Sequence, residues 1–143
     1  MESHDGVTAI ELRVRYAETD QMGVAHHAAY LVWCEQARTD HMRALGVSYR
    51  EMELGGILLP VVEATLRYRA AARYDDLVRV HCWVREIASR RVGFGYAMER
   101  ADDDLLLATA HTALIAVDST HALTRIPEHI RAKMVPIPDP VRL

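Results

Sequence analysis

The sequence lacks the features that place a chain in a membrane, on nucleic acid or outside the cell. No apolar run approaches the ~20 residues that a membrane-spanning helix needs. The net charge is −3, and no basic tract stands out that could bind nucleic acid. The opening stretch, MESHDGV, contains acids and no apolar signal region. We therefore expect a cytoplasmic protein with no membrane span and no nucleic-acid partner.

Cysteine is also scarce, which argues against a disulfide framework or a metal cluster. Cys34 and Cys82 are the only cysteines, and they do not form a CxxC pair. We interpret both as buried, reduced thiols. His26 and His27 are adjacent, so we expect their rings to point apart, and no third ligand is suitably spaced. The sequence therefore predicts no metal site and no cofactor.

Internal repeats, linkers and low-complexity tracts are absent as well. A chain of 143 residues is long enough to bury roughly two thirds of its unfolded surface around one core. We therefore expect a single domain over residues 1–143.

Glycine and proline are missing from residues 28–45, and this stretch predicts one long helix that Gly46 ends. Apolar side chains recur in it at helical spacing. Among them are Tyr30, Trp33, Cys34 and Ala37. Residues 28–34 are apolar on nearly every side, so we expect other elements to surround the first half of the helix. Glu35 and Arg38, three residues apart, are expected to form a structural ion pair.

Five other stretches predict strands, because their side chains alternate between apolar and polar or are apolar on both faces. They cover residues 9–16, 57–70, 76–87, 91–100 and 105–117. Short helices are expected at residues 48–54 and 127–134, with Pro127 at the first helical position of the second. One long helix and five strands joined by short turns predict the α+β class. We expect a five-stranded, largely antiparallel sheet wrapped around the long central helix.

The strand at residues 76–87 is expected to be half-buried. Because its residues alternate, its valines and Cys82 are expected to face the helix, and the residues between them are expected to face solvent. The solvent-facing residues are Arg79, His81, Trp83 and Arg85.

The strand at residues 91–100 has one face of small residues. Gly93, Gly95 and Ala97 lack bulk there, which suggests that another surface approaches closely. Together with open sheet edges, this face favours a homo-oligomer.

Three motifs resemble a known family. RYAETDQMGVAHHAAY, LPVVEATLRYRAAARYDD and SRRVGFGY are similar to the hotdog-fold acyl-CoA thioesterases of the YbgC and 4-hydroxybenzoyl-CoA thioesterase group. The similarity spans about residues 13–127. It implies the hotdog fold, assembly into homodimers or homotetramers, and active sites between subunits. The chain departs from the family at Ala29, where relatives often have Asn, and at Leu114-Ile115, where they often have a His-hydrophobic pair.

The resemblance implies roles for particular residues. Asp20 matches the catalytic carboxylate, which acts either as a general base on water or as a nucleophile. The backbone N–H near His27 would stabilise the oxyanion, and Gly23 would let the loop turn tightly beside the substrate. Residues expected to contact the acyl-CoA substrate are Tyr30, Glu63, Arg90 and Arg91, with Arg67 or Arg69 as further candidates for its phosphate groups.

Alternatives remain open at this stage. An Asp before a helix also forms Asx-turns, and paired arginines also make an ordinary solvated surface. Two other functions fit a hotdog fold, namely a dehydratase or hydratase of acyl chains and a non-catalytic acyl-CoA binding module. Glu18, the neighbouring acid, is expected to have no catalytic role.

Overall fold

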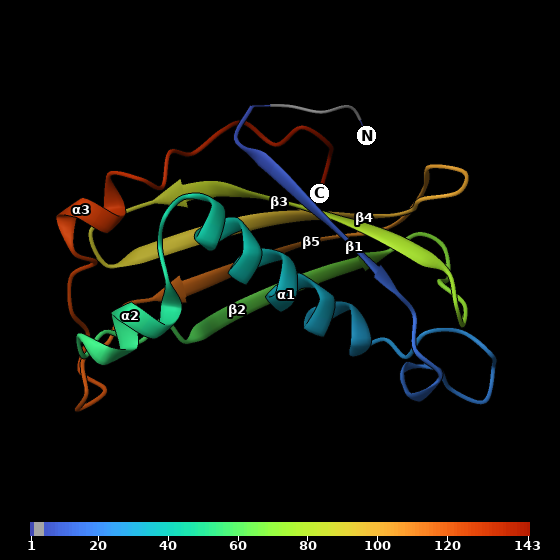
Figure 1. Cartoon of the computed structure of the whole chain (residues 1–143), viewed down its shortest axis with the longest axis horizontal. Coiled ribbons are helices and arrows are strands. Elements are labelled where there is room, and N and C mark those ends of the chain that lie inside the picture. Colours follow the sequence, from blue (N-terminus) through green and yellow to red (C-terminus); the bar gives the residue numbers. More distant parts are fainter. Residues whose placement is uncertain (2–4) are drawn as a thin grey trace.

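The computed structural model describes residues 1 and 5–143 and contains one long helix, five strands and several short helices (Figure 1). In chain order these are β1 (Val7–Arg13), a 3₁₀ helix (Tyr16–Glu18), α1 (Ala29–Ala44), α2 (Tyr49–Leu54), β2 (Val61–Tyr68), β3 (Leu77–Ile87), β4 (Arg91–Arg100), β5 (Leu105–Ile115) and α3 (Glu128–Arg131). None of the helices among the described residues is long and apolar enough to cross a membrane.

The five strands form one antiparallel sheet in the order β1-β3-β4-β5-β2. The strands before and after α1 in the chain, β1 and β2, lie at opposite edges of this sheet. The connection between them therefore carries α1 across one face of the sheet (Figure 1). This arrangement confirms the predicted fold, a five-stranded antiparallel sheet with one long helix packed on it.

The core lies between α1 and the inner face of the sheet. The side chains of Tyr30, Trp33, Cys34 and Ala37 on α1 are buried, as predicted. The sheet residues beneath them are buried as well, namely Val78, Val80, Val84, Phe94 and Tyr96.

The first half of α1 is less enclosed than the sequence suggested. Leu31 is 39% exposed and Val32 is 55% exposed, although both belong to the apolar run. The sheet covers only one side of the helix, so within one chain these side chains remain at the surface. The prediction of a fully surrounded helix was wrong for these positions.

The expected ion pair between Glu35 and Arg38 was wrong, because Arg38 binds two tyrosines instead. Its guanidinium is buried and donates hydrogen bonds to Tyr49 Oη at 3.2 Å and Tyr96 Oη at 3.1 Å. Arg38 lies one turn after buried Cys34, so its side chain faces the sheet while Glu35 faces solvent.

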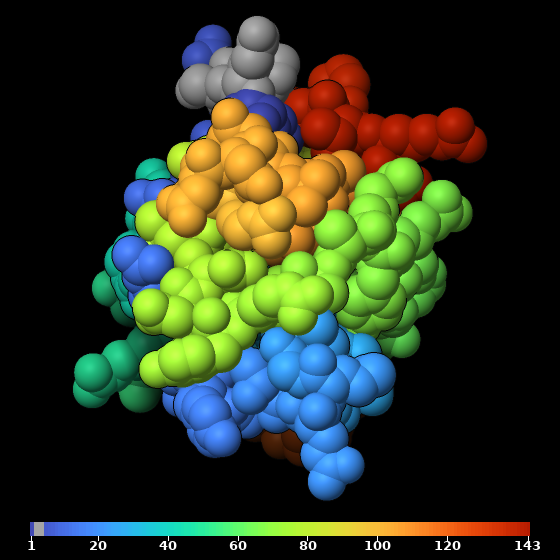
Figure 2. Space-filling view, turned by 90° about the vertical axis from the view of Figure 1, so that its right-hand side faces the viewer, coloured from blue at the N-terminus to red at the C-terminus, as the bar shows by residue number. Residues whose placement is uncertain are grey.

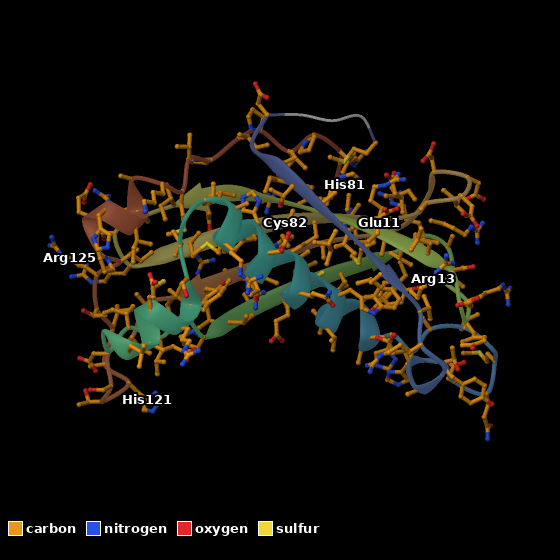
Figure 3. All side chains as sticks on the ribbon, in the orientation of Figure 1. Glu11, Arg13, His81, Cys82, His121 and Arg125 are labelled. Atoms are coloured by element: carbon orange, nitrogen blue, oxygen red, sulfur yellow. The ribbon has the colours of Figure 1, made fainter. Side chains whose placement is uncertain are left out.

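The outer face of the sheet is also covered, contrary to the prediction for β3. His81 is 6% exposed and Trp83 is fully buried, whereas Cys82 between them belongs to the core cluster with α1; Figure 3 labels His81 and Cys82 on β3. The Trp83 indole donates a hydrogen bond to Asp139 Oδ1 at 3.0 Å. The C-terminal segment therefore packs on this face, which alternation within a strand could not reveal.

Side chains of the same chain fill the space beside the glycines of β4. A Cβ at Gly95 would overlap the Trp83 ring, and one at Gly93 would lie 2.6 Å from Glu86 Cγ. The close surface that these glycines predicted is thus the neighbouring strand β3, and they do not indicate another subunit.

Several element ends differ from the predictions. The strand expected at residues 57–70 is shorter, since β2 covers only Val61–Tyr68, and it forms a sheet edge. α3 has four residues, and Pro127 is its N-cap with extended backbone, not its first helical residue. β1 ends at Arg13, three residues before the predicted end.

Candidate active site

The loop before α1 turns tightly around Asp20. Asp20 Oδ1 accepts a hydrogen bond from Met22 N at 2.9 Å, and Gly23 N donates to Asp20 O at 3.0 Å. Asp20 N donates to Val24 O, also at 3.0 Å. Gly23 has φ of +76°, a conformation that is strained for residues with a Cβ. The loop is therefore a short closed turn that holds the Asp20 carboxylate in one place.

A cavity of about 360 Å³ opens beside this turn. The loop before α1, the start of α1 and the segment after β2 form its walls. The lining residues are Asp20, Met22, Val24, Ala25, His27, Tyr30, Tyr68, Arg69, Ala70 and Ala71. Figure 2 views the molecule from the end that carries this loop, which lies in blue against the green segment around residue 70. Three predicted site residues, Asp20, His27 and Tyr30, thus line one cavity.

Several hydrogen bonds fix the two walls of the cavity to each other. Ala25 N donates to Ala72 O at 2.7 Å, and Ala72 N donates to Tyr30 Oη at 3.1 Å. Tyr68 Oη donates to His27 O at 2.8 Å. The Tyr30 and Tyr68 rings meet edge to face, with centroids 5.1 Å apart. Burial raises the pKa of Tyr30, so its phenol stays protonated and serves as a structural acceptor.

The backbone N–H of His27 lies just before the first turn of α1. No acceptor for it exists among the described residues, whereas the neighbouring N–H groups of His26 and Ala28 bond to Glu18 O and His26 Nδ1. N–H groups at a helix start carry partial positive charge and are available to a ligand. The His27 amide is therefore unengaged by the described residues, at a residue that lines the cavity.

The histidine rings at this position do not point apart as we expected. The centroids of His26 and His27 are 4.1 Å apart, with 34° between the ring planes. Both side chains are exposed to solvent, so the rings can lie against each other without giving up contacts in the core. Among residues 1 and 5–143, no three His, Cys, Asp or Glu side chains are grouped so that they could hold a metal ion.

Glu18 has a structural role that the sequence did not reveal. Its Oε1 accepts from Arg15 N at 2.8 Å, and its Oε2 accepts from Trp33 Nε1 at 2.8 Å. Its side chain is only 9% exposed. Glu18 therefore fastens the 3₁₀ helix to α1 and keeps its carboxylate away from the cavity.

Three predicted substrate contacts lie elsewhere in the same chain. Arg91 pairs with Glu63 at 3.7 Å and with Glu86 at 3.2 Å, near the start of β2 and of β4. Arg90 is exposed next to this cluster. The cavity adjoins the other end of β2, at Tyr68, so one chain does not bring Glu63, Arg90 and Arg91 to Asp20.

Two polar residues of the cavity, Tyr68 and Arg69, were not assigned to it from sequence. Tyr68 belonged to the expected strand at residues 57–70, and Arg69 was considered only for phosphate contacts. Both precede the turn that returns the chain to β3, and their position against the Asp20 loop depends on the Val24–Arg73 bridge. Such long-range pairing leaves no local signal in the sequence.

The arrangement suits chemistry at a carbonyl group. Asp20 Oδ1 is held by Met22 N, while Oδ2 has no partner among the described residues and is free for a substrate or water. A free N–H donor and a carboxylate on the same cavity are the parts needed to stabilise an oxyanion and to activate or supply a nucleophile. Val24, Ala25, Ala70 and Ala71 give the cavity apolar walls.

Comparison with known proteins places these features in context. The family model described as the thioesterase-like superfamily matches residues 14–134. The chain is 38% identical over 112 residues to the protein YneP of Bacillus subtilis, covering 78% of this chain and 80% of YneP. It is 31% identical over 115 residues to the acyl-CoA thioesterase YbgC of Haemophilus influenzae, covering 80% and 83%. The crystal structure of a DHNA-CoA thioesterase from Staphylococcus aureus is similar with a TM-score of 0.78 and 34% identity, covering 84% of this chain and 79% of that one.

Proposed function

The chain belongs to the thioesterase-like superfamily, and on this basis we propose that it is an acyl-CoA thioesterase whose chemistry depends on Asp20 and the N–H of His27. The observation that carries the proposal is the placement of the Asp20 carboxylate and the free His27 amide on one cavity. The relatives named as acyl-CoA thioesterases support the reaction class.

In the proposed reaction the thioester carbonyl oxygen accepts a hydrogen bond from His27 N–H. Negative charge develops on that oxygen in the tetrahedral intermediate, and the start of α1 stabilises it. Collapse of the intermediate breaks the C–S bond and releases CoA. The acyl chain occupies the apolar walls, and Arg69 provides positive charge at the cavity.

Asp20 has two possible roles in this reaction. As a general base, it takes a proton from a water molecule that attacks the carbonyl carbon, and the proton then passes to the departing thiolate. As a nucleophile, its free oxygen attacks the carbonyl, and water cleaves the resulting mixed anhydride. A single turnover in ¹⁸O-water that leaves the label in the protein identifies the nucleophile, because water has then attacked the Asp20 side of the anhydride. Label in the product acid alone is the outcome of general-base catalysis and also of attack on the acyl side of an anhydride.

We further propose a homodimer that joins the β2 edges of two chains. β2 has β5 on one side only, and Val61 and Val62 at its start are exposed. Antiparallel pairing of two β2 strands would bring the start of one beside the end of the other. Glu63, Arg90 and Arg91 of one chain would then approach the Asp20 cavity of its partner, where the arginines can meet the phosphate groups of CoA.

The function is tested with a panel of acyl-CoA substrates in which thiol release and enoyl absorbance are followed separately. Thiol release identifies a thioesterase, enoyl formation a dehydratase, and binding without turnover a binding module. The thiols of the protein itself should not interfere, because Cys34 and Cys82 are buried and burial raises the pKa of Cys34 to about 12.

The residue assignment is tested by Asp20→Asn. The amide can still accept from Met22 N, so the turn keeps its shape while the charge is lost. We expect single-turnover hydrolysis to slow by ~10²–10⁴-fold while acyl-CoA affinity stays nearly constant. Asp102→Asn, in the exposed turn between β4 and β5, is the matched control and should keep wild-type rate. An Asp20→Asn protein that keeps more than about a tenth of the rate would rule out the catalytic assignment.

A further inference from the structure

A second, smaller cavity lies on the outer face of the sheet, which is turned away from α1. Its volume is about 140 Å³. Strands β2, β3 and β5 and the C-terminal segment contribute its walls. The lining residues are Thr65, Arg67, Arg85, Thr109, Ala110, His111 and Leu143.

Strand register places the polar residues of this cavity together. Thr65 pairs with His111, and Arg67 pairs with Thr109. Residues directly opposite each other in an antiparallel pair share a face, and so do residues two apart in one strand. The four side chains therefore form a compact square on the outer face.

The hydroxyl of Thr109 has no hydrogen-bond partner. Thr109 is only 1% exposed, and its Oγ1 is unpaired among the described residues. Buried hydroxyl groups are nearly always paired, because leaving one without a partner is unfavourable. Nor does any described residue pair with the side chains of Thr65, Arg67 or His111. The cavity thus collects polar groups that the chain itself leaves unsatisfied.

The side chains that line the cavity carry positive charge. Arg67 and Arg85 contribute guanidinium groups, and no acidic side chain is among the lining residues. At its margin, Asp139 accepts from Arg85 Nε at 3.0 and 3.1 Å, and none of the described residues pairs with the terminal guanidinium nitrogens of Arg85. Arginine, histidine and threonine together offer several donors to one acceptor group, a combination that suits an oxyanion.

We propose that this cavity binds a single phosphate group. Its volume is well below the several hundred Å³ of a pocket for a whole metabolite, so it fits one tetrahedral anion and excludes the acyl chain. The phosphate belongs either to free inorganic phosphate or to a phosphomonoester such as the 3′-phosphate of CoA. Because Thr65 and Arg67 face away from α1 while Tyr68 lines the Asp20 cavity, this site is separate from the proposed catalytic one.

Isothermal titration calorimetry at constant ionic strength tests the site with two ligands. Inorganic phosphate and adenosine 3′,5′-bisphosphate are each titrated into the full-length protein, with chloride as the blank. We expect saturable binding of at least one of them. Tighter binding of the nucleotide assigns the site to a phosphomonoester, and equal or tighter binding of inorganic phosphate assigns it to the free anion.

Variants connect the binding to the cavity. Arg67→Gln should weaken phosphate binding by about 10- to 100-fold, because a charge-assisted hydrogen bond is lost. Arg50→Gln, on the exposed side of α2, removes the same charge elsewhere and should leave binding unchanged. Equal affinity of Arg67→Gln and wild type, or no saturable binding of either ligand to wild type, would overturn the proposal.

Thr109→Val provides a second readout that a purely structural threonine would not give. Without phosphate, the variant should melt at a higher temperature than wild type, because the unpaired hydroxyl is gone. Added phosphate should raise the melting temperature of wild type and raise that of the variant less. An equal phosphate effect on both proteins would contradict a site at Thr109.

Discussion

At the scale of single residues, the acids before α1 divide into a structural one and one that faces the cavity. Glu18 is held by two donors, Arg15 N and Trp33 Nε1, and Asp20 by one, Met22 N. The sequence places both acids on the same short segment and cannot show which of them turns inward. Only the contact between the 3₁₀ helix and Trp33 separates their roles.

Glu18→Gln should therefore destabilise the protein more than an ordinary surface substitution. The amide presents an NH₂ group to one of the two donors, so one of the two hydrogen bonds is lost. We expect the free energy of unfolding to fall by about 1–3 kcal/mol in chemical denaturation. Glu35→Gln on the exposed side of α1 is the control. Equal stability of the two variants would contradict this role for Glu18.

At the scale of elements, helix and strand positions follow closely from the sequence, and faces follow less well. β4 has the predicted bounds, Arg91–Arg100, because strict alternation and turn residues mark both ends. The burial of Trp83 could not be predicted, since its cover comes from Asp139 at the other end of the chain. Leu31 and Val32 were predicted to be buried because they belong to an apolar run, yet both are exposed.

Trp33 tests how strongly α1 is packed on the sheet. The side chain is 2% exposed, and the edge of its indole bonds to Glu18. Trp33→Ala should lower the free energy of unfolding by ~3–5 kcal/mol through the cavity that it leaves. Val32→Ala, the exposed neighbour, should cost less than about 1 kcal/mol. A small loss for Trp33→Ala in urea unfolding would show that α1 is loosely packed.

The link between β1 and α1 should make stability depend on pH. His41 is buried, its Nδ1 lies 2.7 Å from Thr8 Oγ1, and burial lowers its pKa below the ordinary value. Below about pH 6.5 the unfolded chain binds a proton at His41 that the folded chain resists, so stability should fall as the pH falls. Urea unfolding at about pH 7 and pH 5 should show a smaller loss for His41→Gln than for wild type. Exposed His129→Gln should keep the wild-type dependence.

At the scale of the whole molecule, part of the candidate site could be predicted and part could not. The resemblance of RYAETDQMGVAHHAAY assigned Asp20, Gly23 and His27 to the candidate site, and Asp20 and His27 line one cavity in the structure. Glu63, Arg90 and Arg91 were assigned to the same site, yet within one chain they lie at the far end of β2. A sequence read as one chain carries no information about which end of a strand would meet a second copy in the proposed dimer.

The proposed dimer is tested by Val62→Asp, which places a charge on the exposed β2 edge. Light scattering should show a shift toward monomer, and thioester hydrolysis should fall in parallel if each site draws on two chains. Val135→Asp introduces the same charge at an exposed position outside the sheet and should leave the assembly intact. A fully active monomer would argue against shared sites.

The two tryptophans lie on opposite faces of the sheet, Trp33 beneath α1 and Trp83 beneath the C-terminal segment. Each indole donates to one carboxylate, Glu18 or Asp139. Their fluorescence can therefore be separated by replacing either one with Phe. With Trp83→Phe, the remaining emission reports on the loop that carries Asp20, and with Trp33→Phe it reports on the outer face near Arg85. The protein thus contains two intrinsic optical probes, one for each cavity described above.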